Sequence, residues 1–265
     1  MALALGLFSR VGLRVKLLAF ETSTEACSVA LLVDGNVLSR GAIVPRRHAE
    51  LVLPWADELL AEAGIVKSQL DAVACTRGPG AFTGIRLGIA VTQGIALALD
   101  RPVITASSLR VLIEPFLDAA RIANAGLLAL LDARMGELYA AAWSAARQPD
   151  PGFDLDASGA DALAESLCDP AALCDAMWSQ GSATGWIVCG SGVPMVCETF
   201  KSNEQRTVVT HGDALPHAEH LVRMAASALA RGEAIDAADI RPVYLRNEVA
   251  LTTAQRATQS RPPLV

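Results

Sequence analysis

Residues 16–44 have the sequence KLLAFETSTEACSVALLVDGNVLSRGAIV, in which mainly apolar runs are separated by short turns. Leu17–Glu21 and Cys27–Val33 predict two buried strands. The Asp-Gly-Asn sequence at 34–36 then predicts a hairpin turn into a third strand, Val37–Val44. Strands joined by such short connections are antiparallel. These residues therefore predict an antiparallel meander within a sheet.

Helices and strands alternate after this meander. A helix is predicted at His48–Ala63, where Gly64 suits a C-cap, and a second, apolar helix at Phe82–Leu99. Strands are predicted before and after the second helix, at Ala72–Thr76 and Pro102–Thr105. A further helix begins at Ser107. Antiparallel strands followed by alternating helices and strands predict an α/β domain with a mixed sheet.

A second copy of this arrangement is expected further along the chain. Leu127–Asp132 and Glu137–Trp143 predict two strands joined by a turn, and Trp186–Cys189 predicts another strand. Residues 146–184 contain three prolines and many small residues, so we expect them to be less regular. Pro216–Arg231 predicts a helix with proline in its first turn.

This order of elements predicts an α/β, two-domain actin-like (ASKHA) fold with ribonuclease-H-like motifs and mixed five-stranded sheets. Residues 16–106 are predicted to form the first domain and residues 107–250 the second, although helix 216–231 can pack back on the first. We expect residues 1–15 and 251–265 to be a disordered extension and a disordered tail.

The leader Met1–Val15 is apolar but contains Arg10 and Arg14. It has neither the layout of a secretory signal nor the length of a membrane span. The alternatives are an organelle transit peptide, a dispensable extension, and a true start of the protein near Lys16. We expect its deletion to leave folding intact.

The composition excludes several classes of protein. Just over half of the residues are apolar (52%) and 19% are charged, which excludes general disorder. The formal net charge is −6, and Arg46-Arg47 forms the longest basic run. Independent RNA binding is therefore disfavoured, although a local basic patch stays open. Six cysteines without a C-x-x-C pair indicate buried thiols in a reducing cytoplasm.

Two turns are candidates for phosphate binding. Thr22 and Ser23 follow the first strand, and Gly78 and Gly80 lie in a glycine-rich turn that enters a helix N-terminus. Backbone N–H groups at such places suit an anion. The first turn lacks glycine and the second lacks the Lys-Ser/Thr ending of a P-loop, so ordinary turns are the alternative.

The two predicted helices of the first domain have more apolar surface than one sheet face can bury. Around Phe82–Leu99 apolar residues cover nearly the whole circumference, and Gly84 and Gly88 are four residues apart, a spacing that lets another helix approach. On His48–Ala63, Leu53, Ala56, Leu60 and Ala63 form a stripe suited to the sheet, and a second stripe lies about 100° away. A broad core face, or Gly88 packed within its own domain, is the alternative. The predicted partner interface comprises Leu51, Val52, Trp55, Leu59, Gly84, Gly88, Val91 and Ile95, with Trp55 as the leading anchor.

Four motifs carry a family resemblance. FETSTEACSVALLVDG (20–35), RGPGAFTGIRLGIA (77–90), DARMGELYAAAW (132–143) and RPVYLRNEVA (241–250) occur in this order and together resemble the bacterial TsaB (YeaZ) family. The resemblance implies a non-catalytic, cytoplasmic subunit that supports its paralogue TsaD, together with TsaE, in transferring a threonylcarbamoyl group to N6 of adenosine 37 in tRNA. It also implies a homodimer when the chain is alone, tRNA and ATP or ADP bound only through the complex, and no membrane association.

Comparison with TsaD argues against catalysis by this chain. The paralogue has Asn-His-x-x-x-His after the matching strand, and its histidines help to bind a metal. Here these positions are Ser108 and Leu112, and leucine is no metal ligand. No catalytic or metal-binding residue is therefore assigned, and the two turns described above stay the candidates for a cofactor site.

Other histidines offer no clear replacement for that metal site. His48 is interpreted as an exposed residue at a helix start, and His217 and His220, with His211 nearby, lack further convergent ligands. An M22-type peptidase and an actin-like small-molecule kinase or ATPase, with Glu21 as metal anchor, are the alternative functions.

Overall fold

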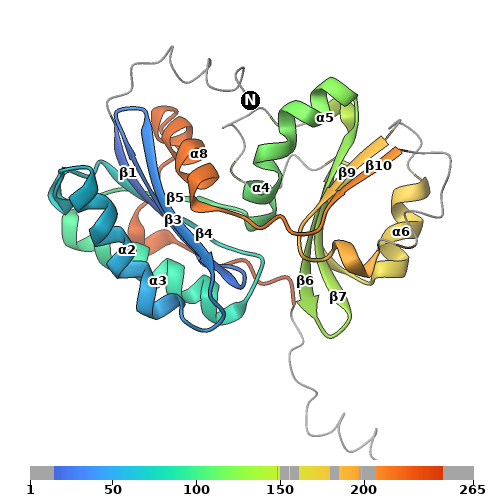
Figure 1. Cartoon of the computed structure of the whole chain (residues 1–265), viewed down its shortest axis with the longest axis horizontal. Helices are drawn as coiled ribbons and strands as arrows, with labels where there is room; N and C mark the ends of the chain where they lie inside the picture. The colour runs from blue at the N-terminus through green and yellow to red at the C-terminus, as the bar shows by residue number, and fades with distance from the viewer. Residues whose placement is uncertain are drawn as a thin grey trace, which may run out of the picture.

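The computed structural model describes residues 15–147, 149, 155, 161–179, 185–196, 198 and 207–246. They form two lobes, each built on a five-stranded sheet (Figure 1). The strand orders are β3-β2-β1-β4-β5 and β10-β9-β6-β7-β8. The predicted α/β fold with two mixed five-stranded sheets is confirmed.

The first sheet contains the predicted meander and two parallel strands. β1 is antiparallel to β2, which is antiparallel to β3, while β4 is parallel to both β1 and β5. Phe20 of the central strand lies beside Val29 on one side and Cys75 on the other. The strand bounds are β1 Lys16–Glu21, β2 Ala26–Val33, β3 Asn36–Ile43, β4 Ala72–Thr76 and β5 Val103–Ala106.

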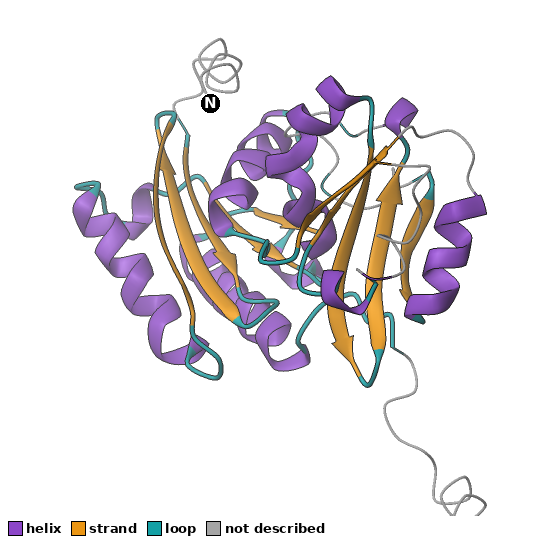
Figure 2. Ribbon diagram, turned by 45° about the vertical axis from the view of Figure 1, so that its right-hand side comes forward, coloured by secondary structure: helices purple, strands orange, loops and turns teal. Residues whose placement is uncertain are grey.

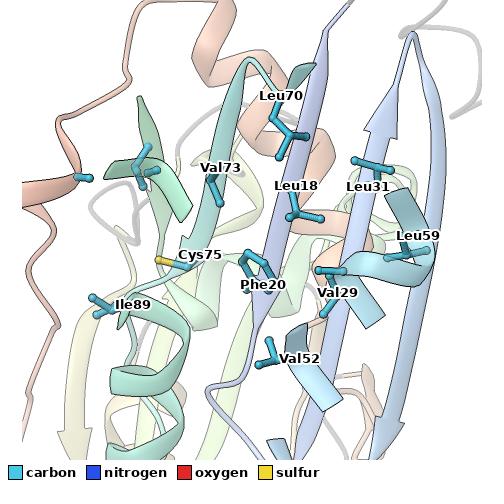
Figure 3. Close-up of a cluster of buried hydrophobic side chains, with 14 of the residues drawn as sticks. Leu18, Phe20, Val29, Leu31, Val52, Leu59, Leu70, Val73, Cys75 and Ile89 are labelled. Carbon is cyan, nitrogen blue, oxygen red and sulfur yellow. The ribbon is translucent and has the colours of Figure 1, made fainter. Parts of the chain in front are cut away.

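Helices cover both faces of the first sheet. One face packs against α2 (His48–Glu62) and α3 (Phe82–Leu99); Figure 3 shows Phe20 and its sheet neighbours facing Val52 of α2 and Ile89 of α3. The other face packs against α8 (Ala218–Ala230), so the 216–231 region belongs with the first sheet. Pro216 precedes this helix instead of lying in its first turn, because His217 is the N-cap.

The second sheet repeats the arrangement of the first. β6, β7 and β8 form an antiparallel meander, and β9 and β10 run parallel to β6. α4 and α5 cover one face and α6 covers the other. The bounds are β6 Gly126–Arg134, β7 Glu137–Trp143, β8 Leu163–Cys168, β9 Gly185–Cys189, β10 Thr207–His211, α4 Ser108–Ile113, α5 Leu117–Ala123 and α6 Pro170–Ser179.

The remaining elements are short. α8 and α4 lie between the two sheets, while α2, α3 and α6 lie on the outside (Figures 1 and 2). The 3₁₀ turns are η1 Lys67–Gln69, η2 Glu114–Phe116, η3 Ala145–Arg147, η5 Val193–Met195 and η6 Ala237–Asp239.

Two expectations need correction. The segment 146–184, expected to be less regular, contains β8 and α6. The strand was missed because β8 is half-buried, so its apolar pattern in the sequence is weak. Val15 belongs to the fold: its side chain is 7% exposed in the core, and its carbonyl accepts a hydrogen bond from Asp34 N (3.2 Å). Residues 1–14 and the predicted tail 251–265 lie outside the described residues.

Candidate functional site

The β1–β2 turn packs directly onto the glycine-rich turn before α3. Ser23 O accepts a hydrogen bond from Ala81 N (2.7 Å), and Thr22 Oγ1 donates one to Gly84 O (2.8 Å). Thr22 and Ser23 are 1% and 0% exposed. The structure thus brings the predicted turn residues together, and they contact one another directly. Phosphate binding there stays a prediction.

Glycines permit this close approach. A Cβ at Gly80 would collide with Ser23 O, a Cβ at Gly84 with Thr22 O, and a Cβ at Gly88 would lie 2.6 Å from Thr22 Oγ1. The four-residue spacing had indicated room for another helix, and that interpretation is wrong, because the β1–β2 turn occupies this side of α3. Gly84 and Gly88 therefore serve contacts within the first lobe.

Glu21 closes the turn from inside the lobe. The carboxylate is 0% exposed; Oε1 accepts a hydrogen bond from Ser23 N (2.6 Å), and Oε2 has no hydrogen-bond partner in the described part of the chain. Burial raises the pKa of Glu21, and hydrogen bonds from Ser23 oppose the shift. A carboxyl group in this setting is costly to ionise, which makes it sensitive to any movement of the turn.

His48 closes the same turn from outside. Its Nε2 lies 3.0 Å from Thr24 O and 3.1 Å from Ala26 O, so a protonated Nε2 donates to the turn. The interpretation of His48 as an exposed capping residue is wrong: Arg47 is the N-cap, and His48 is half-buried. Sequence reasoning missed this link because the partners are 22 and 24 residues away.

Ser108 and Leu112, where the resemblance places the histidines of TsaD, are both buried in α4. Ser108 N donates to Gly78 O (2.9 Å), and Leu112 packs under the second sheet. Between them, Arg110 is 0% exposed and pairs with Glu114 (2.6 Å). α4 thus joins the glycine-rich turn to the core of the second lobe.

The other histidines have local structural contacts. His217 Nδ1 accepts a hydrogen bond from Glu219 N (3.1 Å) at the start of α8, and the His217 and His220 rings are 6.5 Å apart. Burial lowers the pKa of both. His211 instead stacks on Phe116 at 4.5 Å. Across the described residues, no group of three His, Cys, Asp or Glu side chains could hold a metal ion.

The described cysteines are free thiols, and four of the five are buried. Burial raises the pKa of Cys27 and of Cys75 to about 12. Thiols of this kind are unreactive at neutral pH. The prediction of buried thiols is confirmed for Cys27, Cys75, Cys174 and Cys189, whereas Cys168 is half-buried and Cys197 lies outside the described residues.

The outer side of α2 differs from the predicted interface. Val52 and Leu59 are 1% and 0% exposed in the core, whereas Leu53, assigned to the sheet-facing stripe, is 45% exposed. The helix is rotated so that Val52, Ala56, Leu59 and Leu60 face the sheet. Val52 and Leu59 therefore leave the predicted interface.

Trp55 and Leu51 lie on one flank of α2. Both are half-buried, and they continue a row with Glu58 and Glu62, which pair with Arg40 of β3. This flank faces β3, at the edge of the first sheet, while α3 lies on the β4 side of α2. Trp55 is therefore separated from the outer face of α3.

α3 exposes an apolar outer face. Ile85, Ile89 and Ala96 are buried against the sheet, and Val91 and Ile95 are half-buried beside them. Leu97 is 64% exposed. The outer face of α3 comprises Leu87, Ala90, Gly94, Leu97 and Ala98. By length and composition this helix could cross a membrane, but its packing on the sheet is that of a helix in a folded domain.

Two mixed sheets with the same strand order define a protein of the actin-like class. A family model described as TsaD, tRNA N6-adenosine threonylcarbamoyltransferase, matches residues 36–254. The chain is 34% identical to the tRNA threonylcarbamoyladenosine biosynthesis protein TsaB of Escherichia coli, over 89% of this chain and 96% of that protein. It is 32% identical to the Haemophilus influenzae protein of the same name, over 88% and 94%. The chain therefore belongs to the TsaB (YeaZ) family, as its motifs indicated.

Solved structures agree with this assignment. YeaZ from Pseudomonas aeruginosa is 39% identical, with a TM-score of 0.67, over 87% of this chain and 100% of that one. An uncharacterized Pseudomonas aeruginosa protein with similarity to peptidase YEAZ is 38% identical, with a TM-score of 0.69, over 88% and 100%. The similarity thus extends over both lobes.

Proposed function

We propose that this chain is the non-catalytic, activating subunit of a complex that transfers a threonylcarbamoyl group to N6 of adenosine 37 in tRNA, with TsaD as its partner. The observation that carries the proposal is the outer face of α3. Large contiguous apolar surfaces on soluble proteins usually mark interaction sites. Ala90, Gly94 and Ala98 are small, so a second helix can approach closely, and Leu87 and Leu97 supply apolar contacts.

The partner would supply the chemistry. The α4 positions that correspond to the metal-binding histidines of TsaD hold a buried serine and a buried leucine, which pack instead of facing a substrate. TsaE, ATP or ADP, and tRNA would join through the complex, in the cytoplasm. Without TsaD, the same face of α3 would pair with a second copy of the chain in a two-fold dimer.

Reconstitution tests this function. TsaD, TsaE, tRNA, ATP and threonylcarbamoyl-adenylate are combined with and without this chain, and modified adenosine is measured over several turnovers. We expect sustained modification only when the chain is present, and none from the chain alone. Equal modification without the chain, or robust modification by the chain alone, would overturn the proposal. Metal analysis and nucleotide titration of the isolated chain test the peptidase and kinase alternatives.

A further inference from the structure

An arginine lies against two exposed aromatic rings at the N-terminal end of α3. The guanidinium carbon of Arg86 is 3.6 Å from the centroid of the Phe82 ring, and Arg86 Nε donates a hydrogen bond to Tyr244 Oη (2.8 Å). The two rings are 5.5 Å apart, and Phe82 and Tyr244 are 53% and 41% exposed. We call Phe82, Arg86 and Tyr244 the arginine–aromatic cluster.

The two segments that carry the cluster are rich in arginine, although the chain has a formal charge of −6. Residues 72–99 and 240–246, which meet here, contain Arg77, Arg86, Arg241 and Arg246 but no aspartate or glutamate, and Asp239 of the adjoining η6 lies 4.0 Å from Arg241. Arg246 pairs with Glu137 (2.7 Å), whereas Arg86 makes no ion pair with any described residue. The N-terminus of a helix of 18 residues adds partial positive charge.

The cluster is held at the junction of the two lobes. Val243 N donates to Arg77 O (2.8 Å), which lays residues 241–246 across the start of α3. At the other end of this segment, Arg246 donates to Ala133 O (3.0 Å) in the β6–β7 hairpin. Figure 1 shows this last described segment running from the first lobe to the lower end of β6 and β7. The rings therefore have a fixed position beside both lobes.

We propose that the arginine–aromatic cluster contacts an unpaired loop of RNA. Aromatic rings and guanidinium planes stack on unpaired bases, and an arginine that has no ion pair among the described residues, such as Arg86, attracts phosphates. An acidic chain that binds RNA weakly by itself can still use such a local patch within a complex. The inference rests on the proposed function, since it assigns to this chain a contact with the tRNA that the complex would modify.

The arginine–aromatic cluster and the apolar outer face of α3 are separate surfaces. Gln93 Nε2 donates a hydrogen bond to Ala237 O (2.8 Å), so the flank of α3 that carries Arg86 and Gln93 faces η6. The apolar outer face of α3 lies on a different side of the helix. The same helix thus presents an apolar face for a helix and a cationic, aromatic end for a polyanion.

RNA titration with matched variants tests the proposal. A fluorescent RNA hairpin carrying the anticodon loop is titrated with the chain alone at low salt and with its reconstituted pair with TsaD. Phe82→Ala and Arg86→Gln are each expected to weaken RNA binding roughly tenfold. Arg86→Gln should also lower the slope of log affinity against log salt by about 0.7. Arg101→Gln, just beyond the far end of α3, is the matched control and should bind as wild type.

Two outcomes overturn the inference. Variants that bind RNA as wild type in both titrations would exclude an RNA contact. Variants that lose TsaD binding while the chain alone keeps its RNA affinity would make the cluster part of a protein interface. If wild type forms no pair with TsaD, the proposed function fails, and the titration of the chain alone still decides the role of the cluster. Thermal melts establish that the variants are folded.

Discussion

The two lobes have the same strand order but differ in the helices that follow matching strands. In the first lobe, β3 and β4 lead into α2 and α3, of 15 and 18 residues. In the second, β8 leads into α6, of 10 residues, and β9 leads into η5, of 3 residues. A long helix with an apolar outer face is therefore a feature of the first lobe in the described part of the chain. This places the proposed partner surface on one copy of a repeated module.

The hairpins at matching positions also differ. The turn between β1 and β2 is buried, with Ser23 fully enclosed, whereas Met135 at the β6–β7 turn is 82% exposed. The first turn is fixed between Glu21, His48 and α3, and the second is held through Arg246. The first lobe therefore depends on close packing of the β1–β2 turn against the backbone of α3. This packing fixes the position of α3.

The largest effect is expected where the turn meets α3. Gly84→Ala should lower the free energy of unfolding by about 3 kcal/mol, because the new Cβ collides with Thr22 O. Gly94→Ala on the same helix meets no atom within 4 Å and should stabilise the isolated chain by about 0.5–1 kcal/mol. Urea unfolding measures both. Equal stability of the two variants would show that the turn does not restrict α3.

Substitutions in the two lobes should differ in their effect on TsaD binding. Leu97→Asp, on the outer face of α3, should cost at least ~2 kcal/mol of TsaD binding, about thirtyfold in affinity. Ile122 on α5 is 89% exposed in the second lobe, so Ile122→Asp is a matched control that should bind as wild type. Sedimentation with and without TsaD measures both. A greater loss with the control would move the partner surface to the second lobe.

Trp55→Ala tests how far the partner surface extends around α2. Trp55 lies on the β3 flank of α2, so its truncation should affect the stability of the first lobe more than the affinity for TsaD. Thermal melts and sedimentation of the same preparation compare the two effects. If the variant is as stable as wild type and binds TsaD about thirtyfold more weakly, the surface extends around α2 to β3, with Trp55 as an anchor.

Glu21 should give the first lobe a distinctive pH dependence. Its pKa is raised in the folded state, so between the unfolded and folded pKa values the folded chain binds more protons than the unfolded chain. Its contribution to stability is fully present below the unfolded value and is lost as pH rises through the folded value. In that window the slope is at most about 1.4 kcal/mol per pH unit.

Glu21→Gln should remove this term. Unfolding free energies of wild type and variant are compared from pH 4.5 upwards, and their difference isolates Glu21 from His217 and His220. The depressed pKa values of those histidines act in the opposite direction, destabilising the fold as pH falls. Glu62→Gln, on the exposed side of α2, serves as the control. Parallel curves for wild type and Glu21→Gln would refute a proton-linked role for this carboxyl.

The sequence predicted the order of elements better than the contacts between them. Buried strands such as Ala72–Thr76 have continuous apolar runs and were placed correctly, whereas half-buried β8 has no such signal. The spacing of Gly84 and Gly88 showed that something approaches α3 closely, but not whether it is a helix or a turn. Tyr244 and Arg86 are 158 residues apart, and nothing in either segment alone indicates that they meet.

The smallest effect, an unchanged melting temperature, is expected when residues 1–14, which precede the first central strand, are removed. β6 follows directly from α5, whereas β1 begins one residue after Val15, which is the first described residue. A chain that starts at Val15 after an initiator methionine should melt at the same temperature as the full chain, because the Val15 core contact and the hydrogen bond to Asp34 are kept. A chain that starts at Lys16 should lose about 1–2 kcal/mol, since both are removed. Thermal melts of the three chains measure this. A large loss already in the chain that starts at Val15 would show that residues 1–14 stabilise the first lobe.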